Sequence, residues 1–62
     1  MTDFEGNFYK VVRQLENITG KGVIAITKVG QKRGRFVYAV DFTDGTATDY
    51  YINLEACYIE EV

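Results

Sequence analysis

Hydrophobic residues follow a helical period at the start of the chain and an alternating pattern after it. Over residues 2–19, apolar side chains recur at steps of three and four residues, which places them on one face of a helix. This stripe consists of Phe4, Phe8, Val11, Leu15 and Ile18. Thr2 and Glu5 match a capping box, and Gly20 suits the left-handed turn that ends many helices. The pattern predicts a helix over residues 2–19 that packs on a sheet.

The rest of the chain predicts an antiparallel meander of three or four strands. A β-branched run over residues 22–29 indicates the first strand, and the glycine-flanked segment 30–34 predicts a hairpin loop. Residues 35–42 indicate the second strand, with one face made up of Phe36, Tyr38, Val40 and Phe42. Asp44-Gly45 is a strong turn signal that leads into a third strand at 48–54. The last residues either continue that strand or, as a break near Asn53 favours, form a fourth over 56–60.

A helix followed by an antiparallel meander is an α+β arrangement, and 62 residues make a single domain. One helix covers one face of a sheet, yet the first two strands carry apolar residues on both faces. The uncovered face must close into a small barrel, pair with another subunit or receive a partner. The ending from Val40 to Ile59, with an acidic-Gly turn and a bend before the last strand, resembles the later strands of SH3-like and Tudor-like barrels. That resemblance implies an alternative fold, a small SH3-like barrel preceded by a helix.

Charge is divided along the chain, and the division bears on the choice of partner. All seven Lys and Arg residues lie at or before Arg35, whereas residues 41–62 hold six acids and no base. The net charge of −2 disfavours nucleic acid as a partner. The acidic N-terminal residues lack the order of a signal peptide, no run is apolar enough to cross a bilayer, and the single Cys57 suits a reducing compartment. We therefore expect a cytoplasmic protein that binds no membrane.

The composition argues against catalysis, metal binding and cofactors. The chain has no His, so the commonest general base and zinc ligand is missing. Cys57 has apolar and acidic neighbours, which disfavour a thiolate nucleophile. Asp41, Asp44 and Asp49 do not match a calcium-binding loop, which needs Gly at its sixth position and Glu at its twelfth. Counted from Asp41, Gly45 is fifth and Ile52 is twelfth. We expect a protein that is not an enzyme and has no catalytic, metal or cofactor-binding residues.

The loop between the first two strands brings basic residues close to aromatic ones. Basic side chains follow phosphates and aromatic rings on strands stack on bases in proteins that bind single-stranded nucleic acid. Residues 33–38, Arg-Gly-Arg-Phe-Val-Tyr, resemble the RNA-binding strand motif of RRM domains, except that an Arg replaces the first aromatic and the spacing is one residue short. A solubilising loop is the competing interpretation. The alternative function, single-stranded nucleic-acid binding, would use Lys28, Lys32, Arg33, Arg35 and Phe36.

The main functional prediction depends on the apolar surface that one helix does not cover. Aromatic side chains give large contact areas at low entropic cost, and they are common anchors of protein interfaces. The anchors predicted here are Tyr38, Tyr50, Tyr51 and Tyr58, of which Tyr50 and Tyr51 point to opposite faces. Basic and acidic segments on one chain also suit the pairing of two copies. We therefore predict a small protein-interaction module, a regulator or inhibitor, that acts through an aromatic sheet face and self-associates as a dimer.

Overall fold

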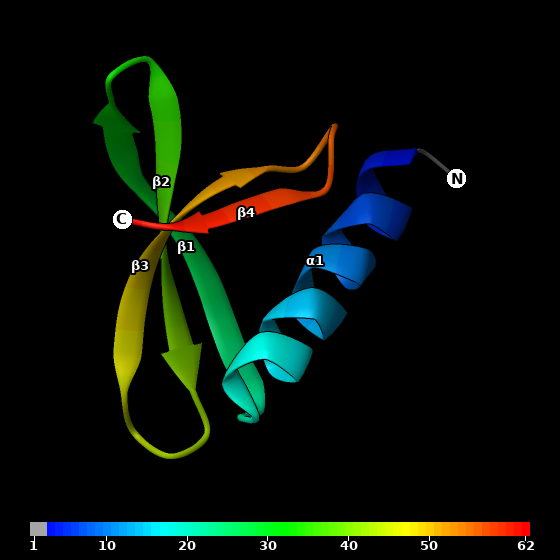
Figure 1. The fold of residues 1–62 in the computed structure, drawn as a ribbon, viewed down its shortest axis with the longest axis vertical. Helices are drawn as coiled ribbons and strands as arrows, with labels where there is room; N and C mark the ends of the chain where they lie inside the picture. The colour runs from blue at the N-terminus through cyan, green and yellow to red at the C-terminus, as the bar shows by residue number, and fades with distance from the viewer. Residues whose placement is uncertain (1–2) are drawn as a thin grey trace.

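The computed structural model describes residues 3–62, with side chains from Gly6 onward, and contains one helix and one sheet (Figure 1). Helix α1 spans Asp3–Thr19, and the strands are β1 at Val23–Lys32, β2 at Arg35–Phe42, β3 at Ala47–Asn53 and β4 at Tyr58–Glu61. The strand order is β1-β2-β3-β4, and each strand is antiparallel to the next. The predicted α+β arrangement is confirmed. The alternative of an SH3-like barrel is wrong, because β1 and β4 stay at opposite edges and the sheet does not close.

Helix α1 packs on the sheet through the middle of its apolar stripe. Val11 and Leu15 are fully buried, whereas Phe8 and Ile18 are 40% and 66% exposed. The helix ends as predicted at Gly20, which has a φ of +70° and donates its N–H to the Glu16 carbonyl at 2.9 Å. Of the predicted capping pair and the apolar stripe, Thr2 and the side chains of Phe4 and Glu5 lie outside the part that the structure describes. The stripe therefore predicts the helix correctly but overstates how much of it is covered.

The core lies between α1 and one face of the sheet, which we call the helix-side face. Val40 and Phe42 of β2 and Tyr50 and Ile52 of β3 are at most 4% exposed. Their neighbours Val23, Ile26, Tyr38, Leu54 and Ile59 are partly buried against them. Phe36, predicted to share a face with Val40, is 42% exposed, because it lies near the end of the β1–β2 hairpin that extends beyond the helix (Figure 1).

The β1–β2 hairpin is longer than the sequence predicts. Its loop is only Arg33-Gly34, and Lys32 pairs directly with Arg35. Both loop residues have positive φ, +55° and +75°, which is the conformation of a tight two-residue turn. The predicted five-residue loop over 30–34 is therefore wrong, since β1 continues through Gly30 to Lys32 with an irregular register between Lys28 and Gly30.

The β3–β4 connection confirms a separate fourth strand but moves its start from residue 56 to Tyr58. The Asn53 Oδ1 atom accepts hydrogen bonds from the backbone N–H groups of Glu55 at 3.0 Å and Ala56 at 3.3 Å. Cys57 then takes a φ of +52°, and β4 begins at the next residue. The side chain of Asn53 thus organises a turn in the segment where the sequence alone only indicates a break.

The other face of the sheet, which we call the outer face, has no helix over it. Val37 and Tyr51 are paired across β2 and β3 on this face. Val37 is nevertheless only 7% exposed, and Tyr51 is half-buried. The exposed aliphatic residues of β1 are Ile24 and Val29, 66% and 57% exposed, at the two positions where its register shifts. The outer face is therefore less apolar than the sequence predicts, because its own side chains cover its centre.

Candidate functional site

The sheet divides into two hairpins near one end, and a cleft lies where they part. Pairing between β2 and β3 ends at Val37 and Tyr51, although β2 begins two residues earlier and β3 continues two residues further. In Figure 1 the tip of the β1–β2 hairpin points upward, while the β3–β4 hairpin runs toward the N-terminal half of α1. The cleft has a volume of about 390 Å³. It is lined by Gly34, Arg35, Phe36, Tyr38, Tyr51, Ile52, Asn53, Leu54, Glu55 and Tyr58.

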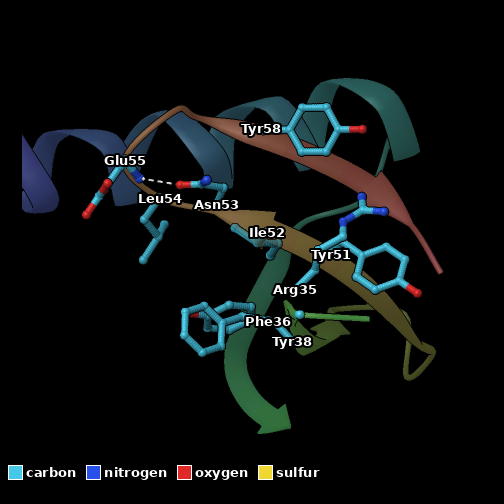
Figure 2. A pocket seen from close by; sticks show the side chains of 10 residues that line it. Arg35, Phe36, Tyr38, Tyr51, Ile52, Asn53, Leu54, Glu55 and Tyr58 are labelled. Atoms are coloured by element: carbon cyan, nitrogen blue, oxygen red, sulfur yellow. Dashed lines mark hydrogen bonds between the residues drawn. The ribbon is translucent and has the colours of Figure 1, made fainter. Parts of the chain in front are cut away.

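Arg35 is fixed on the outer side of this cleft by two rings and a carboxylate. Its guanidinium carbon lies 3.9 Å from the centroid of the Tyr51 ring and 5.9 Å from that of the Tyr58 ring. Figure 2 shows the guanidinium group between these two side chains. The Arg35 Nη2 atom donates to Glu60 Oε1 at 2.8 Å, and the Tyr58 hydroxyl donates to the same oxygen. The stacked, ion-paired geometry is one that suits arginine and not lysine.

The same contacts determine the protonation states of the cluster. Hydrogen bonds from Tyr58 and Arg35 lower the pKa of the Glu60 carboxyl. The hydrogen bond to Glu60 raises the pKa of Arg35, and it also raises the pKa of the Tyr58 hydroxyl. Near neutral pH the cluster therefore contains a charged arginine, a charged carboxylate and a neutral phenol. Its net charge is zero, because Arg35 from the basic part of the sequence is paired with Glu60 from the acidic part.

A second cation covers an aromatic ring close to the cleft. The Lys28 ammonium nitrogen lies 3.9 Å from the centroid of the Phe36 ring. Lys28 pairs with Tyr38 across β1 and β2, on the same face of the sheet as the core. One face of the Phe36 ring is therefore already occupied by a side chain of the same molecule, at the short distance typical of a cation–π contact.

The structure brings most of the predicted anchors together and separates one of them. Tyr38, Tyr51 and Tyr58 all line the cleft, with Tyr58 48% exposed. Tyr50 lies instead in the core, 4% exposed, where burial raises the pKa of its hydroxyl. Tyr50 and Tyr51 point to opposite faces, as predicted, but only the ring of Tyr51 is available to a partner.

Of the residues predicted for nucleic-acid binding, two line the cleft and the others lie next to or beyond it. Arg35 and Phe36 are lining residues, and Lys28 contacts the Phe36 ring. Lys32 and Arg33 are exposed at the hairpin tip and are not among the lining residues. The five residues therefore do not form one continuous basic surface in the described part of the chain.

The sequence does not point to several residues that form or support the cleft. It places Glu60 only among the six acids of residues 41–62, yet Glu60 holds Arg35 and Tyr58 in place beside the cleft. Ile52, Leu54 and Glu55 supply the β3 side of the cleft. The alternation of the last strand is the one signal that would have found Glu60, because Tyr58 and Glu60 share a face and Glu60 pairs with Tyr51.

A second, shallower groove of about 410 Å³ lies between α1 and β4. Its lining residues are Gln14, Asn17, Ile18, Cys57, Tyr58 and Ile59. The thiol of Cys57 is half-buried there. In the part of the chain that the structure describes, no three His, Cys, Asp or Glu side chains lie close enough together to hold a metal ion.

No family model, curated protein or solved structure matches this chain. Over residues 3–62, the structure contains no helix that is both long and apolar enough to cross a membrane.

Proposed function

We propose that this chain is a small, non-enzymatic protein-interaction module that binds another protein through the cleft between its two hairpins, and that it also self-associates. The observation that carries the proposal is that four aromatic side chains line the cleft where the hairpins part, Phe36 and Tyr38 from the helix-side face and Tyr51 and Tyr58 from the outer face (Figure 2). Aromatic side chains in concave sites are the commonest anchors of protein interfaces. The module would act as a regulator or inhibitor of the protein it binds, in the cytoplasm, where Cys57 would stay reduced.

The cleft suits an extended, largely apolar segment of a partner. Its walls are ring faces and the aliphatic side chains of Ile52 and Leu54, while Asn53 and Glu55 supply polar groups from the β3 end. Aromatic-lined grooves bind extended peptides in several unrelated recognition domains. Because Arg35 and Glu60 neutralise each other, the cleft favours ring contacts over recognition of a charged group.

A peptide-display selection tests this proposal, with the partner represented by random extended peptides. We expect enriched peptides that carry aromatic or aliphatic residues, and at least tenfold weaker binding of these peptides to Phe36→Ala and Tyr58→Ala. Tyr9→Ala is the matched control, because Tyr9 is 62% exposed on α1 and lies under Arg13 at 5.9 Å, like Tyr58 under Arg35. The cleft would be ruled out as the binding site if the selection enriched no peptides, or if Tyr9→Ala and Tyr58→Ala weakened peptide binding equally.

Single-stranded nucleic-acid binding is the second candidate function, and it is favoured by Lys32 and Arg33. Both are exposed at the hairpin tip, and neither makes an ion pair within the described residues. Three features weigh against it: the net charge of −2, the ion pair of Arg35 with Glu60, and the Lys28 ammonium group that covers Phe36. These leave two basic side chains where a phosphate-binding surface needs several.

Fluorescence anisotropy with a labelled single-stranded oligonucleotide separates the two candidates. If the tip binds phosphates, affinity falls steeply with salt, and the double variant Lys32→Ala with Arg33→Ala weakens binding to every oligonucleotide sequence. If wild type and double variant bind equally, the tip is not the contact. Peptide binding to the cleft should be the same in both proteins, since neither residue lines it.

A further inference from the structure

The outer face of the sheet has bases at one end and acids at the other. Lys32 pairs with Arg35 next to the hairpin tip. The exposed carboxylate of Asp41, which pairs with Ala47, lies at the opposite end, and that of Asp49, which pairs with Ala39, lies nearer the middle of the sheet. In Figure 1 these ends are the hairpin tip at the top and the β2–β3 turn at the bottom. Because directly paired residues share a face, the four charged residues project from the same side of the sheet.

On the outer face, the paired residues of β1 and β2 below the hairpin tip are small or already covered, whereas the large side chains of Arg35, Tyr51 and Tyr58 gather over β3 and β4. Ala25 pairs with Asp41, Thr27 with Ala39, and Gly30 with Val37, which is 7% exposed. Because the side chains on this face of β1 and β2 are short, a second sheet can approach these two strands to the spacing of about 10 Å at which sheets stack. Large side chains at these positions would hold the two sheets apart.

We propose that a second copy of this chain packs the β1–β2 part of its outer face on the same part of the first copy, about a two-fold axis that lies between the two sheets and runs perpendicular to the strands. This proposal rests on the self-association included in the proposed function, and it names the surface and the partner. A two-fold axis brings the same patch of both copies together and makes every contact twice. In this orientation, Lys32 of each copy faces the end that carries Asp41 in the other.

Charge complementarity selects this orientation among the face-to-face alternatives. An axis parallel to the strands would place the Lys32 end of one copy on the Lys32 end of the other, and the Asp41 end on the Asp41 end. Like charges would then meet at both ends. Lys32 is the base available for the contact, because the charge of Arg35 is already paired with Glu60 at 2.8 Å. The perpendicular axis is therefore the one that joins opposite charges at both ends.

The size of the face predicts a weak dimer that depends on concentration and salt. A standard interface buries about 800 Å² on each partner, which is roughly a fifth of the 4316 Å² surface of this protein. The outer face provides few large anchors, and rim charges contribute little at high ionic strength. We expect sedimentation equilibrium to show reversible dimers at low salt and less dimer as salt is added.

A charge swap between Lys32 and Asp41 tests the geometry directly. Lys32→Glu and Asp41→Lys each place like charges at both symmetric contacts, so each variant alone should raise the dimer dissociation constant by roughly tenfold. An equimolar mixture of the two variants, and the double variant that carries both changes, restore opposite charges at both contacts and should recover the wild-type constant. Lys10→Glu is the control for net charge, because Lys10 is exposed on α1, and it should leave the constant unchanged.

The possible results separate this inference from the proposed function. The dimer would be overturned if the protein sediments as a monomer at low salt at all concentrations up to about 1 mM, which is well above the dissociation constants of stable complexes. That result would not affect the peptide-binding test of the cleft. Dimers that Lys32→Glu does not weaken, or that the mixture does not recover, would overturn the outer-face geometry while self-association stands. Unchanged circular dichroism of the variants shows that they are folded, which is expected because both residues are exposed.

Discussion

Leu15 and Ile18 belong to one apolar stripe of α1, but the structure gives them different energetic roles. Leu15 is fully buried in the core, whereas Ile18 is 66% exposed beside the α1–β4 groove. Replacing a buried leucine by alanine costs about 2–5 kcal/mol, from lost transfer energy and the cavity that remains. Complete burial of an isoleucine is worth about 1.5–3 kcal/mol, so Ile18, with about a third of its surface buried, should contribute less than about 1 kcal/mol.

The comparison is sensitive because the protein is small. At about 0.05–0.15 kcal/mol per residue, 62 residues give a total stability of roughly 3–9 kcal/mol. Leu15→Ala should therefore shift the urea midpoint far down or leave the protein largely unfolded, while Ile18→Ala should move it little. Far-UV circular dichroism and tyrosine fluorescence both follow the transition, since the chain contains five Tyr and no Trp. If Leu15→Ala and Ile18→Ala lowered the free energy of unfolding equally, α1 would not pack on the sheet through Val11 and Leu15.

Three further predictions concern turns and titratable groups. Hydrogen bonds from the side chain and backbone of Thr46, and then from Lys21, lower the pKa of Asp44 from 3.8 to about 2. The ionised carboxylate of Asp44 therefore stabilises the folded state fully above pH 3.8, the pKa in the unfolded chain, and this stabilisation is lost as the pH falls from 3.8 to about 2. The urea midpoint should therefore fall more steeply with acid in wild type than in Asp44→Asn. Glu60→Gln should lower the pKa of Tyr58 toward 10.0, because it removes the carboxylate that favours the neutral phenol, and NMR of the Tyr58 ring against pH would detect it; an unchanged pKa would contradict the hydrogen bond. Gly34→Ala should cost about 1–2 kcal/mol in urea titrations because its φ is +75°, whereas Gly6→Ala inside α1 should stabilise by up to about 1 kcal/mol.

Local sequence signals were enough to predict the elements of the fold, and tertiary packing decided the rest. The helix end at Gly20 and the turn at Gly45 depend on a single backbone conformation, and both glycines have the expected positive φ. The boundary of β1 depends on how a loop closes, and the sequence did not indicate that Arg33 would share the left-handed conformation with Gly34. An arginine at positive φ carries no compositional signal, since this conformation favours Gly, Asn and Asp.

The candidate site was harder to predict than the fold, because it joins residues that are far apart in the chain. Tyr50 and Tyr58 are equally good anchors by residue type, but α1 covers the face that carries Tyr50 and leaves Tyr58 at the cleft. The cleft itself exists because β2 and β3 stop pairing at Val37 and Tyr51, and an alternating pattern does not reveal where a register ends.

The pairing of Arg35 with Glu60 changes the meaning of the charge division along the chain. In the sequence, these residues belong to a basic and an acidic segment that both look available to partners. In the fold, they neutralise each other beside Tyr51 and Tyr58, so the cleft becomes a site for ring contacts. The charges that stay available lie at the far ends of the outer face, at Lys32 and at Asp41. The proposed peptide binding and the proposed self-association would therefore depend on different side chains, and a charge reversal at Lys32 should weaken self-association while leaving peptide binding intact.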